Sequence, residues 1–275
     1  MIKSFQFFIF LHLILIGLMS CGQEPSDSHS LSKTGQNSQQ ASLLNVFFHE
    51  MSSLEVEVFY EDESEPYTGT TALGKDYWNL FEVNLKEILK ASERNSLSIS
   101  IDTKLNEMTR FDKRTQTSWS TRELNSLFSE LGAKEASSNQ GILSVIFVSG
   151  HFRDNAGEVQ EGVLGIHITG TTHIVIFKDV IKKIEASENT WVARFSEQSV
   201  LVHEVGHALG LVNNGLRMTT DHQDKEHGDH CNNQKCVMYW LNEGRDGLQQ
   251  FIRDYISTGN EVIFDDQCLN DAHNH

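Results

Sequence analysis

The chain has 275 residues and a formal net charge of −16, with 39% hydrophobic and 22% charged residues. This composition is typical of a globular protein and excludes a disordered or collagen-like chain. The acidic balance argues against binding to nucleic acid or to anionic lipid, because both require a basic surface. The longest apolar run lies at the extreme N-terminus and is shorter than the roughly 18 residues that read as a membrane-spanning helix.

Residues 1–20 have the pattern of a signal peptide: Lys3 precedes an apolar stretch over residues 5–18, and a small residue ends the segment. The following Leu18-Met19-Ser20-Cys21 resembles a bacterial lipobox, which implies that Cys21 is lipidated and anchors the protein to a membrane. Gly22 in place of Asp implies, by the same resemblance, the outer membrane of a bacterial cell envelope. The alternative is a plain secretory signal that is followed by a cysteine.

A flexible tether is predicted after the anchor. Residues 22–42 are rich in Ser, Gln and Gly and have almost no apolar content, so residues 21–42 form the lipidated cysteine and its tether. We expect one folded domain over residues 43–275, with an N-terminal part at 43–210 and a C-terminal part at 211–275. This domain would be periplasmic or exposed at the cell surface.

Hydrophobic periodicity predicts the elements of this domain in chain order. Strands are expected at 54–60, 97–101, 143–148, 163–168 and 173–177, and helices at 77–89, 121–131 and 197–209. Ser120 or Thr121 would cap the second helix and Ser196 the third. This order predicts an α+β fold, a mixed twisted sheet of about five strands with helices packed on it.

The third predicted helix carries the HExxH pattern His203-Glu204-Val205-Gly206-His207. Residues four apart share a helix face, so His203 and His207 can both direct an imidazole at one metal ion. Glu204 lies beside that face, where a general base could reach water on the metal. The alternative interpretation is a surface helix with two solvated histidines.

Gly210 extends the pattern to HExxHxxG, which resembles the metzincin clan of zinc peptidases. A glycine adopts positive φ without steric cost, so the chain can turn sharply away from the helix there. The position of the clan's third zinc ligand is Asn213, whose neutral amide is a poor ligand. The third ligand is therefore expected further downstream.

The downstream pattern His230-Cys231-x4-Cys236-x-Met238 resembles the archaemetzincin branch, with an insertion of about seventeen residues after Gly210. The resemblance implies a metzincin-like fold with an active-site helix and a smaller C-terminal subdomain. It also implies zinc ligands His203, His207 and His230, Glu204 as catalytic base, and Met238 as the Met-turn methionine beneath the zinc. Met238 as an ordinary core residue stays an alternative. The alternative third ligands are His222, then His227 or Glu243, the last by a faint resemblance to thermolysin-like enzymes.

The remaining cysteines leave several pairings open. In an exported protein Cys231 and Cys236 are expected to form a disulfide, with Cys268 as an odd thiol. Archaemetzincins use a later CxxC to complete a second zinc site, and only Cys268 follows here. A zinc site of three cysteines with a histidine such as His273 is the alternative. His222 and His227 belong to a solvated acidic loop or bind a second metal.

These features together predict a Zn²⁺-dependent peptidase acting on a peptide or protein substrate. The strand at 163–168, if it lies at the sheet edge above the site, could hold an extended substrate by strand addition. The alternative is a non-catalytic metal-binding or adhesive lipoprotein of the envelope. The acidic histidine-containing loop favours that alternative, whereas Glu204 disfavours it, because a storage site needs no base beside its ligands.

Overall fold

The computed structural model of the chain describes residues 33–71, 74–90, 97–188, 190–258 and 260–275. The predicted signal peptide, Cys21 and most of the predicted tether therefore lie outside the described residues. Within the described ranges no helix is long and apolar enough to cross a membrane.

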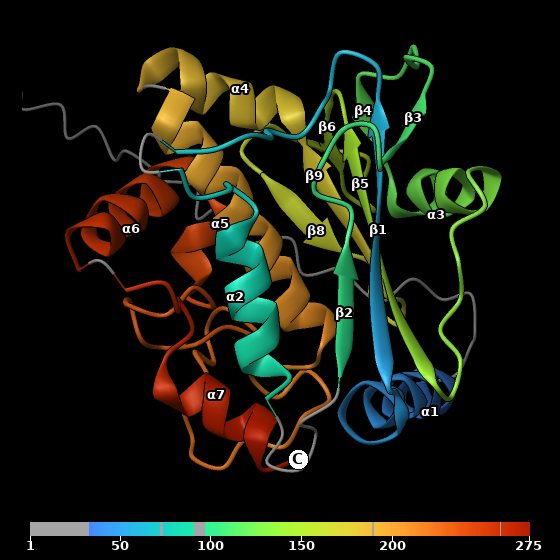
Figure 1. The fold of residues 1–275 in the computed structure, drawn as a ribbon, viewed down its shortest axis with the longest axis vertical. Helices are drawn as coiled ribbons and strands as arrows, with labels where there is room; N and C mark the ends of the chain where they lie inside the picture. The colour runs from blue at the N-terminus through green and yellow to red at the C-terminus, as the bar shows by residue number, and fades with distance from the viewer. Residues whose placement is uncertain (1–32, 72–73, 91–96, 189, 259) are drawn as a thin grey trace, which may run out of the picture.

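A mixed six-stranded sheet forms the centre of the fold, which confirms the α+β class (Figure 1). Its order is β2-β1-β5-β9-β8, with β3 also paired to β1. All pairs are parallel except β8 with β9, so β8 is an antiparallel strand at one edge. The bounds are β1 (Ser53–Glu61), β2 (Ser98–Ile101), β3 (Thr109–Phe111), β5 (Gln140–Val148), β8 (Gly165–His167) and β9 (His173–Phe177).

The five predicted strands correspond to β1, β2, β5, β8 and β9, and β3 is an addition that sequence periodicity did not indicate. The apolar run predicted as a central buried strand is β5, which is buried from Gly141 onward between β1 and β9. A second, three-stranded sheet has the order β4 (Ser118–Trp119), β6 (His151–Arg153) and β7 (Val159–Gln160). Strands of two or three residues are too short for an alternating pattern to reveal them.

Helices cover both faces of the main sheet (Figure 1). One side carries α2 (Asn79–Ile88), α4 (Lys178–Ser187), α5 (Thr190–Ala208) and α6 (Arg245–Thr258), and the other side carries α3 (Thr121–Glu130). The chain closes with η2 (Trp240–Glu243) and α7 (Asp266–His273). Ser120 caps α3 in a capping box with Glu123, as the sequence predicts.

The helix that carries HExxH begins earlier than expected. α5 starts at Thr190, so Ser196 is a fully buried residue within it and not its N-cap. From Ser196 to Ala208 every residue of α5 is buried, because β8, β9 and the helices α2, α4 and α6 surround it. A helix that is buried on all sides has no polar face, so its sequence lacks the apolar–polar periodicity from which the extent of a helix is predicted.

The end of the predicted tether is helical. α1 (Lys33–Asn45) includes residues 33–42, which we expected to be flexible. Gln40 Nε2 donates to the carbonyl oxygen of Asn214 at 2.6 Å, and Leu44 is buried against the turn that follows α5. These contacts join residues more than 160 positions apart, so local composition could not reveal them.

Candidate metal centres

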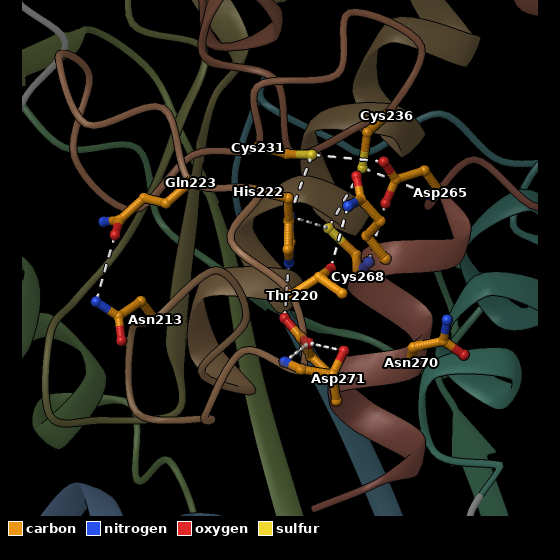
Figure 2. Close-up of polar contacts among 12 residues, drawn as sticks. Asn213, Thr220, His222, Gln223, Cys231, Cys236, Asp265, Cys268, Asn270 and Asp271 are labelled. Atoms are coloured by element: carbon orange, nitrogen blue, oxygen red, sulfur yellow. Dashed lines mark hydrogen bonds and ion pairs between the residues drawn. The ribbon is translucent and has the colours of Figure 1, made fainter.

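The chain leaves α5 through a glycine turn that directs the next segment back over the helix. Gly210 has φ +78°. The Gly210 N–H donates to His207 O and the Leu211 N–H donates to Gly206 O, both at 3.0 Å, which is a Schellman motif. Asn213 also has positive φ, and its side-chain amide donates to Gln223 Oε1 at 3.3 Å (Figure 2).

The expected insertion is an ordered part of the fold. Gln223 pairs with Cys231 in an antiparallel bridge, the Asp224 N–H donates to His230 O at 2.7 Å, and the Asn232 N–H donates to His222 O at 2.9 Å. These bonds fix the backbone of His230 and Cys231 from one side. The Cys231 N–H also donates to Met238 O at 2.8 Å, which fixes it from the other side.

Four side chains converge in the first candidate metal centre: His203 and His207 of α5, His230 after the insertion, and Glu243 at the end of η2. Their ligand atoms all lie within 4.8 Å of one another. The Nε2 atoms of His203 and His207 are 3.1 Å apart. Neighbouring ligands on a tetrahedral zinc ion with bonds of about 2.0–2.1 Å are about 3.3 Å apart, so this spacing fits a zinc ion. The sequence offered Glu243 only as an alternative to His230 as third ligand, whereas the structure places both residues together.

Hydrogen bonds prepare two of these histidines as ligands. His203 Nδ1 lies 2.7 Å from Val237 O, and His230 Nδ1 lies 2.6 Å from His227 O. Because a carbonyl oxygen only accepts, each Nδ1 carries the proton and each Nε2 keeps its lone pair for a metal. Burial lowers the pKa of His203 to about 3 and also lowers the pKa values of His207 and His230. The imidazoles are therefore neutral, the form that binds metal ions.

Met238 packs against the helix that carries two of these histidines. It is fully buried, and a Cβ added at Gly206, which lies between His203 and His207 in the sequence, would overlap its Sδ atom. Met238 therefore contacts the helical turn that presents these two histidines.

Glu204 lies between the helix and the edge strand. It is 3% exposed, and the backbone N–H of His167 on β8 donates to its carboxylate. Burial raises the pKa of Glu204 to about 8, and the His167 hydrogen bond opposes that shift. A carboxyl group with this pKa exchanges a proton readily near neutral pH.

Three thiols form the second candidate centre. Cys231, Cys236 and Cys268 are free and fully buried, and their sulfur atoms lie within 4.8 Å of one another and of a carboxylate oxygen of Asp265 (Figure 2). The structure therefore differs from the expected Cys231–Cys236 disulfide. The reason is that α7 brings Cys268 to the same point, with its Sγ 3.5 Å from that of Cys236. Convergence of three sulfurs favours a metal over a single pair.

His222, which the sequence offered as a third ligand for the first centre, belongs to the second. Its Nδ1 lies 3.4 Å from Cys231 Sγ and 4.0 Å from Cys268 Sγ, and its Nε2 lies 2.7 Å from Asp271 Oδ2 (Figure 2). Asp265 accepts from Cys231 Sγ at 3.5 Å as well as from the Cys268 N–H at 2.9 Å and from Asn233 at 2.8 Å. Asp265 and His222 could therefore each supply a fourth donor to the three thiols.

The electrostatics of this centre favour a thiolate. Hydrogen bonds from the thiols of Cys236 and Cys268 hold the pKa of Cys231 far below its ordinary value. Burial disfavours a charged His222, but hydrogen bonds to Cys231 and Asp271 raise the pKa of His222 to about 9. A carboxylate that holds the far nitrogen of a ligand histidine is a common feature of metal sites.

Two other predicted ligands lie in neither cluster. His227 stacks on Trp240 with ring centroids 3.9 Å apart, and its Nδ1 lies 2.8 Å from Asp224. His273 Nε2 lies 2.7 Å from Glu87 O, so it is not the fourth ligand of the thiols. The sequence contains no signal for Asp271, whose role depends on a residue 49 positions away.

Comparison with known proteins gives no matching family model, curated protein or solved structure. The fold and the two clusters define an α+β protein with two groups of side chains that could each hold a metal ion.

Proposed function

We propose that the protein is a zinc-dependent peptidase, with His203, His207 and His230 as zinc ligands and Glu204 as general base. The observation that carries this proposal is the position of Glu204. Glu204 directly follows His203 on α5, and its carboxylate is buried and accepts a hydrogen bond from the backbone of the edge strand β8. A site that only stores metal has no use for a non-ligand carboxylate in that place.

A zinc ion bound there would polarise the scissile carbonyl and lower the pKa of the attacking water towards about 7. With zinc bound, Glu204 would accept the proton of that water and would return it to the leaving amine. The hydrogen bond from the His167 N–H orients the carboxylate for both steps.

The edge of β8 offers a place for an extended peptide. Leu164 O accepts the Phe177 N–H at 2.9 Å, and the Ile168 N–H donates to His173 O at 3.0 Å. Because backbone groups alternate in direction along a strand, those of Gly165 and His167 point away from β9, and the His167 N–H among them already donates to Glu204. A substrate strand added at this edge would run beside Glu204.

We further propose that the thiol centre holds a second zinc ion, with His222 as its fourth ligand. Four protein ligands leave no open position, which is characteristic of a structural site. Since Cys231 directly follows His230, this ion would hold the third ligand of the first centre in place. By the lipobox resemblance, Cys21 would anchor the domain to the bacterial envelope.

One observation favours a second candidate function, a non-catalytic metal-binding lipoprotein. Glu243 supplies a fourth donor to the histidine centre, so that centre also has four protein ligands available. Such a closed centre is typical of structural zinc.

Glu204→Gln distinguishes the two functions. The variant should keep the zinc content of the wild type and lose peptide hydrolysis by about 100-fold or more, because only proton transfer is removed. Glu226→Gln, an exposed acid of the insertion, is the matched control and should cleave normally. Hydrolysis of a broad peptide library and zinc per chain are measured together. Undiminished cleavage by Glu204→Gln would remove this residue from the mechanism, and a zinc-loaded wild type without cleavage would favour the second candidate.

A further inference from the structure

We infer that Glu243 is the fourth protein ligand of the histidine centre and holds it closed, so that a substrate carbonyl or an added anion reaches the metal only when Glu243 withdraws. This inference deepens the proposed function and rests on it for the metal at the three histidines and for the peptide substrate, whereas the binding of an added anion tests the closure without the substrate.

The distances place the Glu243 carboxylate where a fourth ligand belongs. Its Oε1 lies 2.5 Å from His230 Nε2, 3.3 Å from His203 Nε2 and 3.6 Å from His207 Nε2. Two of these separations are close to the roughly 3.3 Å between ligands of a tetrahedral zinc ion, whereas the 2.5 Å to His230 Nε2 is a hydrogen-bond distance that a bound zinc ion would lengthen. A residue that only neighboured the site would approach one imidazole and not three.

The chemistry of these atoms supports the same conclusion. His203 and His230 each use the Nδ1 proton in a bond to a backbone carbonyl, so their Nε2 atoms present lone pairs to the carboxylate. Lone pairs that meet in a buried space repel one another unless a proton or a metal cation lies between them, and the 2.5 Å contact of Glu243 with His230 can hold a proton when no metal is bound. The donor set of three imidazoles and one carboxylate suits zinc.

Side-chain contacts fix the backbone of η2, the segment that carries Glu243. η2 follows Met238 closely, and the buried side chain of Asn242 donates to Cys236 O at 3.0 Å and to Val237 O at 3.1 Å. Trp240 stacks on His227, which ties η2 to the insertion. The backbone is thus fixed while the Glu243 side chain stays 21% exposed, so the carboxylate can rotate toward solvent without unfolding the turn.

A closed centre with a buried general base beside it is a latent catalytic site. Four protein ligands occupy the positions of a tetrahedral zinc, whereas catalytic zinc keeps one position for water or substrate. Glu204 is ready for catalysis, but Glu243 competes with substrate for the metal. The apparent affinity for substrate or an added ligand therefore equals the affinity of the open centre multiplied by the fraction of molecules in which Glu243 has withdrawn.

The test uses the full zinc-loaded protein and acetohydroxamate, a small chelating anion that needs an open metal position. Glu243→Gln keeps the side-chain volume but replaces the carboxylate by an amide, which is a poor zinc ligand. We expect it to bind acetohydroxamate at least about tenfold more tightly than the wild type by calorimetry. It should bind zinc at the histidine centre at least about tenfold more weakly in competition with a chelator. The control Glu226→Gln should change neither value.

A second variant keeps the test decisive if Glu243→Gln folds poorly. Glu243→Asp retains the charge but shortens the side chain by one methylene, so it should give an intermediate acetohydroxamate affinity. Equal acetohydroxamate affinity in the wild type and both variants overturns the inference. Absence of zinc from the histidine centre in all proteins overturns both the inference and the proposed function. Zinc and acetohydroxamate binding as expected, without peptide cleavage by Glu243→Gln, leaves the inference standing and refutes the peptidase.

Discussion

Substitution of Gly206 by alanine tests the contact between Met238 and α5. A Cβ at this position would overlap Met238 Sδ and would lie 3.1 Å from Met238 Cε and 3.3 Å from Phe264 Cε1. Met238 is fully buried, so its side chain has little space into which it can move. Overpacking of this kind costs about 1–3 kcal/mol. The better helix propensity of alanine offsets about 0.5–1 kcal/mol of that cost.

We therefore expect Gly206→Ala to lower the free energy of unfolding by about 0.5–2 kcal/mol, the difference of these two effects. Urea unfolding in saturating zinc measures the loss. Gly162→Ala is the control, since a Cβ there meets no atom within 4 Å. The substitution should also displace His203 and His207 and weaken zinc binding in competition with a chelator.

A double-mutant cycle assigns the effect to Met238. Met238→Ala alone should cost about 2–5 kcal/mol because it leaves a cavity. That cavity accepts the new methyl group, so Gly206→Ala should cost little in the Met238→Ala background, with a coupling energy of about 1 kcal/mol or more. Wild-type stability of Gly206→Ala, or costs that simply add, would refute the close packing of Met238 under the ligand turn.

Three further predictions concern the metals, the acid stability and the anchor. His222→Ala and His230→Ala should each lose one of two zinc ions per chain, whereas His227→Ala should keep both. Metal analysis after dialysis measures these contents, and a loss of zinc in His227→Ala alone would contradict the assignment. Burial lowers the pKa of His173 to about 4, so the unfolded chain takes up a proton below about pH 6.5 that the folded protein does not. The free energy of unfolding should therefore fall as the pH falls from about 6.5 towards 4. In urea unfolding, His173→Phe should make this decrease smaller by up to about 3 kcal/mol. If the variant loses as much stability at low pH as the wild type, His173 is not the cause. Cys21→Ser should move the protein from the membrane fraction to the soluble fraction, and continued membrane association would refute the lipid anchor.

Local sequence patterns determined the elements that carry the first centre. The spacing of His203 and His207 places both on one helix face, and Gly210 ends that helix with positive φ, as predicted. The continuous apolar run of β5 predicted a buried strand, and the apolar residues of β9 predicted a further strand. These properties depend on residues a few positions apart, so they can be predicted from the sequence without the tertiary structure.

Tertiary structure decided which distant residues complete each centre. Glu243 joins His230 where the sequence offered them as alternatives, and His222 joins the thiols where it was a candidate for the histidines. The structure has three free thiols instead of the expected Cys231–Cys236 disulfide, because α7 places Cys268 beside Cys236. A metal centre selects its ligands by position in space, and positions of residues tens of places apart follow from packing and strand pairing and not from local pattern.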